Sequence, residues 1–300
     1  MSIVAISQML GSLGDEIGGE LARVLGHEFA DRETILKAAE QFSEGVRGFA
    51  QLTEGKLTLW ECLAESKRRY LTSVEAVIWE LAARDNVVIV GRGAAFVLQD
   101  VRHALRVRVT APQHLRVRRV EGQRGLTPDA VELVRQSDRE HAARIRFLYD
   151  AAWDDPHRYD LVVNTERLDV KGAVQTIRAS LEQERYETTP ASLAKVRNRS
   201  LAASAQAALL RLGSGGQSGD EPGVLAIVRR GAREQFRLLE EAFAGRPARV
   251  MWDRRLSEWR AQAPSAPIES AQGERRAQPA SSWDALGCVI VGEPRVSRSG

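Results

Sequence analysis

Hydrophobic positions in the first 185 residues follow two alternating patterns. Short continuous apolar runs, such as Val87–Val90, are typical of parallel strands covered on both faces. Between these runs, apolar residues recur at helical spacing, as Tyr70, Val74 and Leu81 do, which indicates amphipathic helices. The predicted strands are Ile3–Ile6, Val87–Val90, Leu105–Val109 and Leu161–Val163. Strands that alternate with helices predict an α/β fold with a parallel sheet flanked by helices.

The pattern changes after about residue 187. An Ala/Leu-rich helical stretch, Leu201–Leu212, leads into Gly213–Gly219, whose composition is that of a flexible linker. The chain therefore divides into a domain of residues 1–187, a helix and linker of residues 188–223, and a smaller α/β unit of residues 224–300. The elements predicted for that unit are a strand at Val224–Val228, a helix at Ala232–Phe243, a strand at Arg249–Trp252, a loose Pro/Ala/Ser-rich insert at 261–281 and a final apolar run at Cys288–Val291.

Composition excludes several classes of protein. Charged residues make up 28% of the chain but nearly cancel to a net charge of +3, which disfavours a nucleic-acid-coating protein. Cys62 and Cys288 lie too far apart in sequence to indicate a disulfide framework or a zinc site, and the histidines lack ligand spacing. No apolar run approaches the roughly 20 residues of a membrane helix, and the chain opens on a short strand without a charged leader. We therefore expect a cytoplasmic protein without a membrane partner or a protein-built metal site.

The segment Val4–Ile17 is predicted to run strand, glycine-containing loop, helix. Amide groups at the start of a helix attract phosphate, because they carry partial positive charge and have no partner within the helix. The complete phosphate-loop pattern, Gly-x-x-x-x-Gly-Lys-Ser/Thr, is not met. With Gly14 as its second glycine, Met9 stands at the first glycine, Asp15 at the lysine and Glu16 at the hydroxyl residue. Taken alone, this loop favours a plain strand-turn-helix connection over a phosphate-binding loop.

Further segments accompany this loop in a characteristic order. They are Asp31-Arg32-Glu33, Gly91-Arg92-Gly93, Arg116 with Arg118 and Arg119, Ser137-Asp138-Arg139, Arg144 with Arg146, and Tyr159 to Thr165. In this order and spacing, residues 1–185 resemble the cytidylate-kinase-like family of P-loop nucleoside monophosphate kinases. The resemblance implies a P-loop NTPase-like sheet with a helical lid.

The resemblance also implies roles for particular residues. The nucleotide-binding set it implies is Gly11, Ser12, Gly14, Asp15, Glu16, Asp31, Arg32 and Arg92, with the loop around Gly11 to Gly14 cradling the donor triphosphate. Arg92 matches the arginine of a Gly-Arg-Asp element that helps to hold a pyrimidine nucleotide, but Gly93 replaces the aspartate. Arg139, Arg144 and Arg146 fall in the lid, where arginines neutralise the phosphoryl group in transit. The implied activity is transfer of the γ-phosphate of ATP to a CMP- or dCMP-type acceptor, with Mg²⁺ as cofactor.

Physical chemistry supports a phosphate role for the lid arginines and leaves a plainer one open. Phosphoryl transfer needs in-line positioning and positive groups around the equatorial oxygens more than covalent chemistry. A helix that presents Arg139, Arg144 and Arg146 would supply such groups. The alternative is that these arginines form surface ion pairs with neighbours such as Asp138 and Glu140.

Asp15 is the feature that most affects the functional prediction. Two like charges about 4 Å apart repel by roughly 4 kcal/mol at an effective dielectric constant of 20. There are three alternatives: Asp15 turns outward as a helix-start carboxylate, Asp15 or Glu16 helps to hold Mg²⁺, or the site is no longer that of a kinase. In the last case the protein is a nucleotide-binding or regulatory pseudokinase.

For the C-terminal unit we expect an unknown protein partner rather than nucleic acid.

Overall fold

The computed structural model describes residues 2–40, 64–124, 129–212, 224–229, 231–244, 248–252 and 288–292. The chain divides into two compact units, residues 1–196 and 197–300. The division falls inside one long helix, α9 (Pro190–Leu212). The predicted linker at Gly213–Gly219 and the predicted loose insert at 261–281 lie outside the described residues.

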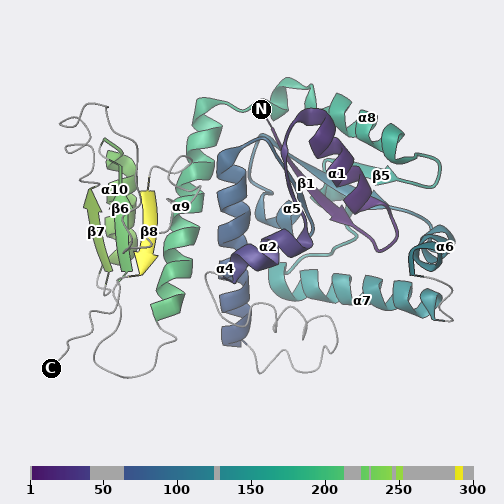
Figure 1. The fold of residues 1–300 in the computed structure, drawn as a ribbon, viewed down its shortest axis with the longest axis horizontal. Helices are drawn as coiled ribbons and strands as arrows, with labels where there is room; N and C mark the ends of the chain where they lie inside the picture. The colour runs from purple at the N-terminus through teal and green to yellow at the C-terminus, as the bar shows by residue number, and fades with distance from the viewer. Residues whose placement is uncertain are drawn as a thin grey trace, which may run out of the picture. The chain divides into compact units, whose positions relative to one another are not determined.

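The first unit is built on a five-stranded parallel sheet in the order β2-β3-β1-β4-β5 (Figure 1). Its strands are β1 (Ile3–Gln8), β2 (Glu28–Ala30), β3 (Val87–Val90), β4 (Ala104–Thr110) and β5 (Leu161–Asn164). The predicted parallel α/β sheet is thus confirmed, with all four predicted strands present. The sequence prediction missed β2, because three residues that begin with an exposed glutamate form no apolar run.

The strand register brings the carboxyl ends of the central strands to one edge. Ile6 of β1 pairs with Val90 of β3 on one side and with Val107 of β4 on the other. The segments that follow β1 and β3 therefore emerge side by side. In open parallel sheets, this edge is where ligands bind.

Helices cover both faces of this sheet (Figure 1). They are α1 (Gly14–Leu25), α2 (Arg32–Ala39), α4 (Ala64–Arg84), α5 (Ala94–Val97), α6 (Gln113–Arg124), α7 (Ala130–Tyr149) and α8 (Val170–Leu181), with short 3-10 turns at Pro156–Arg158 and Glu184–Tyr186. Val4 and Ile6 pack with Ile17 of α1 and Ile177 of α8 in one buried cluster. Because neighbouring strand residues face opposite sides, the equally buried Ile3 shows that the other face is covered too.

Helices α6 and α7 are joined by an apolar cluster of their own. Val117 and Val120 of α6 pack against Ala130 and Val134 of α7, and the side chain of Leu10 packs against this cluster. Leu10 belongs to the loop between β1 and α1 (residues 9–13, hereafter the β1–α1 loop). The loop therefore contacts the α6–α7 apolar cluster through Leu10.

In its described part, the second unit contains the end of α9, a three-stranded sheet in the order β7-β6-β8 and one further helix. β6 (Val224–Val228) pairs in parallel with β7 (Ala248–Trp252) and antiparallel with β8 (Cys288–Gly292). Helix α10 (Arg233–Phe243) packs on β6 and β7 and buries Leu239 and Phe243. Strands and a helix thus lie at the positions predicted for the C-terminal unit, whereas the division into units falls at residue 196 and not at the predicted linker. In the described part of the chain, no helix is both long enough and apolar enough to span a membrane.

Candidate nucleotide site

A cleft of about 500 Å³ opens at the carboxyl ends of β1 and β3. Its lining comes from segments far apart in sequence: the β1–α1 loop, the start of α1, the start of α2, the turn after β3, and α7. The residues that sequence analysis proposed for the site and that line this cleft are Gly11, Asp15, Glu16, Asp31, Arg32, Arg92 and Arg144.

The β1–α1 loop is held by its carbonyl groups. Arg119 donates to the Gly11 carbonyl at 3.1 Å, the Thr165 hydroxyl donates to the Ser12 carbonyl at 3.1 Å, and Arg116 reaches the Leu10 carbonyl at 3.5 Å. A trans peptide places its C=O and N–H on opposite sides. Anchoring the carbonyls of Leu10 and Ser12 from outside therefore turns the amides of Gly11 and Leu13, which both line the cleft, the other way.

The loop backbone is tightly confined around Gly11. Gly11 has φ +76°, and a Cβ there would lie 2.7 Å from the backbone carbonyl oxygen of Arg116. The Ser12 amide donates to the Met9 carbonyl, and the fully buried Ser12 hydroxyl accepts a hydrogen bond from the Met9 amide. Ser12 thus closes the loop on itself and does not line the cleft. Gly14 lies against the side chain of Gln8 and is likewise absent from the lining.

Asp15 and Glu16 are exposed in the first turn of α1 and line the cleft. Glu16 accepts a hydrogen bond from the side-chain amide of Gln123 at 3.2 Å. The residue at the N-cap is Leu13, which has no polar side-chain atom to bind the free amides of the first helical turn. Those amides are available to an anion, but two carboxylates accompany them.

Three arginines form the positive side of the cleft. Among the described lining residues, the positively charged side chains are those of Arg32, Arg92 and Arg144. Arg32 begins α2, whose N-cap Asp31 accepts a hydrogen bond from the Thr34 amide at 2.7 Å, and hydrogen bonds from Thr34 lower the pKa of Asp31. A Cβ on Gly91 would lie 3.5 Å from Cγ of Arg32, so the stem of Arg32 passes beside the turn that carries Arg92.

His141 lies partly buried beside these arginines. Burial lowers its pKa from 6.5 to about 4, with further lowering by Arg144, Arg32 and Arg92. Its Nδ1 lies 2.8 Å from the Ser137 carbonyl oxygen, an acceptor, so a neutral ring donates from Nδ1. Its ring stacks on Trp153 at a centroid distance of 5.1 Å. The region around His141 is therefore electropositive although the imidazole itself is neutral.

Only one of the three predicted lid arginines lines the cleft. Arg144 is buried there, whereas Arg139 is exposed and paired with Glu132, and Arg146 is exposed and outside the lining. Successive α-helical residues turn by about 100°, so Arg139 and Arg146, seven positions apart, lie on one exposed side of α7, and Arg144 leaves the helix in a different direction. The catalytic roles suggested for Arg139 and Arg146 stay predictions.

Sequence reasoning missed the aromatic side of the cleft. The Tyr149 hydroxyl donates to the Arg92 carbonyl at 3.3 Å, and its ring stacks on Phe96 at 5.6 Å. Trp153 donates from Nε1 to the Ser7 hydroxyl at 2.9 Å, next to the end of β1. Burial raises the pKa of Tyr149 well above 10. In sequence these aromatics look like ordinary core residues and carry no separate signal. The spacing of Ser137, His141 and Arg144 along α7 is the one pattern that could have indicated which side of the helix faces the cleft.

Residues 3–167 match the sequence profile of the cytidylate kinase-like family, which is more than half of the 300 residues. The chain belongs to this family. It is 31% identical to a cytidylate kinase of Staphylothermus marinus over 111 residues, which cover 35% of this chain and 59% of that protein. It is 30% identical to a cytidylate kinase of Methanocaldococcus jannaschii over 107 residues, or 34% of this chain and 60% of that protein. The match thus spans about 60% of the length of these two relatives.

A solved structure of similar fold covers the family domain. It is an uncharacterised protein from Eubacterium ventriosum, 18% identical, with a TM-score of 0.50 over 61% of this chain and 100% of that chain. At this identity the likeness concerns the fold alone. Membership of the cytidylate kinase-like family and the parallel α/β fold were both predicted from the sequence, and both are confirmed.

Proposed function

We propose that this protein transfers the γ-phosphate of ATP to a pyrimidine nucleoside monophosphate, CMP or dCMP. The bond between the γ-phosphorus and the bridging oxygen of ATP breaks, and a bond forms to a phosphate oxygen of the acceptor, giving ADP and a nucleoside diphosphate. The observation that carries the proposal is that Arg32, Arg92 and Arg144 line the same cleft as residues of the β1–α1 loop and the first turn of α1.

The two sides of the cleft suit the two nucleotides. The amides of Gly11 and Leu13 and the first turn of α1 suit the donor phosphates, because they present hydrogen-bond donors at a positive helix end. The arginines suit the acceptor phosphate and the charge of the transferred group, since guanidinium groups bind phosphate oxygens in pairs. The aromatic side, which includes Tyr149 and the buried Trp153, keeps water from this end of the cleft.

The family implies Mg²⁺ as a cofactor. The residues of the cleft fit an ion that is held jointly by protein carboxylates and by the phosphates of the nucleotide. Within the described residues, no group of three or more His, Cys, Asp or Glu side chains is placed to hold a metal. In nucleotide sites, however, Mg²⁺ takes only one or two carboxylates and completes its shell with phosphate oxygens and water. Asp15 and Glu16 would hold it, and the ion would neutralise charge on the donor phosphates.

A second candidate function is nucleotide binding without phosphate transfer. It is favoured by Asp15, which stands in the cleft where a phosphate-loop lysine is expected. A carboxylate about 4 Å from a phosphate charge costs roughly 4 kcal/mol at an effective dielectric constant of 20. In this case the protein binds a nucleotide and does not turn it over.

A single set of measurements tests both candidates. The purified full chain is assayed with ATP and Mg²⁺ against CMP, dCMP, UMP, AMP and GMP by coupled ADP release, and nucleotide binding is followed as a rise in Tm. ADP release that depends on CMP or dCMP, with formation of the diphosphate, supports the kinase. Nucleotide-dependent stabilisation without any diphosphate product supports the second candidate. A chain that neither binds nor phosphorylates any of these nucleotides contradicts both.

Asp15→Lys then identifies what Asp15 does. A gain of activity shows that the carboxylate hinders the donor phosphates. A loss of activity, with an increased requirement for Mg²⁺, shows that Asp15 contributes to holding the metal.

A further inference from the structure

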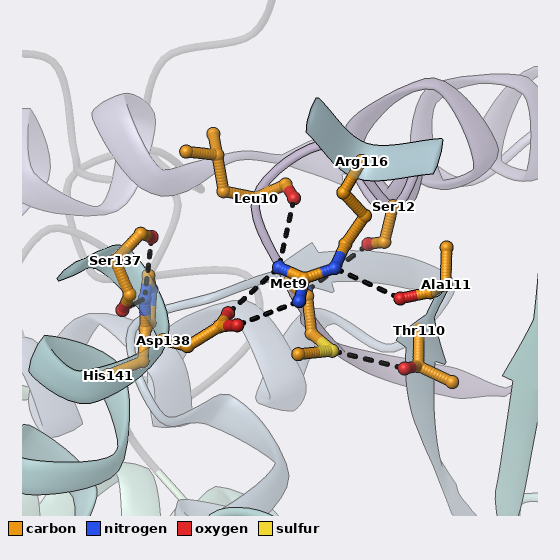
Figure 2. Close-up of polar contacts among 9 residues, drawn as sticks. All are labelled: Met9, Leu10, Ser12, Thr110, Ala111, Arg116, Ser137, Asp138 and His141. Atoms are coloured by element: carbon orange, nitrogen blue, oxygen red, sulfur yellow. Dashed lines mark hydrogen bonds and ion pairs between the residues drawn. The ribbon is translucent and has the colours of Figure 1, made fainter. Parts of the chain in front are cut away.

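Arg116 joins three parts of the first unit at one point (Figure 2). Its Nη1 and Nη2 donate to the two carboxylate oxygens of Asp138 on α7 at 2.9 and 2.7 Å. Its Nε donates to the carbonyl of Ala111, just after β4, at 3.0 Å, and Nη1 also faces the Leu10 carbonyl of the β1–α1 loop at 3.5 Å. One planar guanidinium group thus connects the sheet, the loop and α7.

The arginine side of this connection is buried. The Arg116 side chain is 4% exposed and that of Asp138 is 27% exposed. Breaking one partner of a buried ion pair is costly because the remaining charge stays away from water. The loop is also held sterically, since Gly11 approaches the Arg116 backbone and Leu10 packs in the α6–α7 apolar cluster. A shift of the loop therefore requires a shift of α6 or α7.

The position of Asp138 on α7 links this contact to the cleft. Ser137, His141 and Arg144 stand at positions i, i+4 and i+7 and all line the cleft, so they form one stripe along the helix. Asp138 is the next residue round the helix from Ser137 and points to Arg116 instead (Figure 2). Rotating or sliding α7 to follow Asp138 therefore moves the side chain of Arg144.

We infer that Arg116 is a positioning residue that couples the β1–α1 loop to α7, so that donor binding at the loop and acceptor binding at Arg144 strengthen each other. The inference rests on the proposed function, because it assigns the donor to the loop and the acceptor phosphate to the arginines. Coupling between two sites is reciprocal and is measured as the factor by which one ligand changes the affinity for the other.

The test is to measure this factor in the full chain. The dissociation constants of a non-hydrolysable ATP analogue and of CMP are determined by calorimetry, each alone and each with the other at saturation. In the wild type we expect each ligand to tighten the other about fivefold or more, within the usual range of such couplings. In Asp138→Asn and in Arg116→Lys, which cannot form the two-pronged pair, we expect the factor to fall to within about twofold of unity.

A matched control separates coupling from general stability. Arg106 and Asp160 form an equally two-pronged pair, with distances of 3.0 and 2.7 Å, and neither residue lines the cleft. Asp160→Asn is expected to lower Tm yet to leave the coupling factor at its wild-type value. A factor that falls as far in Asp160→Asn as in Asp138→Asn would overturn the inference, because the loss would then follow stability alone.

The wild type provides a readout that needs no variant to fold. Hydrogen–deuterium exchange with the ATP analogue alone is expected to slow exchange in α7 around residues 137–144, although the analogue binds at the loop. Unchanged exchange in that segment at saturation, or a wild-type coupling factor of one, contradicts the inference and leaves the proposed function standing. Absence of any binding by either nucleotide contradicts the proposed function itself.

Discussion

The ring of Tyr149 occupies the space that a side chain at position 93 would need. Gly93 has φ +78°, and a Cβ there would lie 2.5 Å from Cε2 of Tyr149 and 2.6 Å from its hydroxyl oxygen. Position 93 is where the family resemblance leads one to expect the aspartate of a Gly-Arg-Asp element. With Tyr149 in place at the end of α7, that side chain has no room.

Gly93→Ala is therefore expected to destabilise the protein. A methyl group at a positive φ against a packed ring costs about 1–3 kcal/mol, which urea denaturation would measure as a lower free energy of unfolding. Gly19→Ala is the matched control, because nothing lies within 4 Å of a Cβ on Gly19 in α1. In a helix interior this change stabilises by about 0.5–1 kcal/mol. A free energy of unfolding for Gly93→Ala equal to that of the wild type would show that Tyr149 yields easily.

Arg144→Gln is expected to weaken CMP binding. Loss of one charge-assisted hydrogen bond to phosphate is worth about 1.5–3 kcal/mol, or roughly 10- to 150-fold in Kd by calorimetry. Arg135→Gln on the same helix is the control. Residue 135 is exposed and precedes Arg144 by nine positions, which places it about two and a half turns away on the opposite side of α7. Equal losses in the two variants would point to a long-range charge effect instead of direct phosphate binding.

Thr165→Val is expected to loosen the β1–α1 loop. The change removes the hydroxyl that donates to the Ser12 carbonyl and accepts from Arg119 at 2.9 Å. A buried carbonyl left without its donor costs about 1–3 kcal/mol, and we expect a several-fold weaker affinity for the ATP analogue. Thr176→Val is the isosteric control, because its exposed hydroxyl donates to the Gly172 carbonyl within α8. Unchanged analogue affinity in Thr165→Val would exclude Thr165 as a support of the donor site.

As the pH falls, protonation of His141 is expected to lower the free energy of unfolding. Its folded pKa of about 4 lies below the ordinary value of 6.5, so the unfolded chain binds the proton more readily. The neutral ring contributes its full stabilisation above pH 6.5, and this contribution is lost as pH falls towards 4. When the pKa of a group differs by one between the folded and the unfolded chain, the free energy of unfolding changes by about 1.4 kcal/mol.

The measurement is urea denaturation from pH 8 to pH 4.5 for the wild type and for His141→Gln. Burial lowers the pKa of His27 and His103 as well, so part of the pH dependence remains in the variant. We expect a shallower loss of stability in His141→Gln. Saturating CMP should also weaken the pH dependence of the wild type, because a bound phosphate offsets the arginines that depress the pKa of His141. Parallel curves for the two proteins would show that His141 does not titrate in this range.

Local sequence patterns were sufficient for most elements of the fold. Runs such as Val87–Val90 become central strands because only a strand buried on both faces is apolar at every position. Asp15 and Glu16 were correctly placed at the start of a helix, because the change from the apolar run of β1 to the helical spacing of α1 locates that boundary. The short strand β2 has no such signal and owes its conformation to pairing with β3.

The sequence by itself determined the family and the parallel α/β architecture. Only the tertiary structure decided which arginine of α7 enters the cleft, because the rotation of that helix is set by packing on α6 and by the Arg116–Asp138 pair. It also decided that Tyr149 fills the space beside Gly93 and that Ser12 turns inward. The contacts of Tyr149 with residues 92 and 93 and of Arg116 with Asp138 join residues distant along the chain, and their geometry depends on the elements between them.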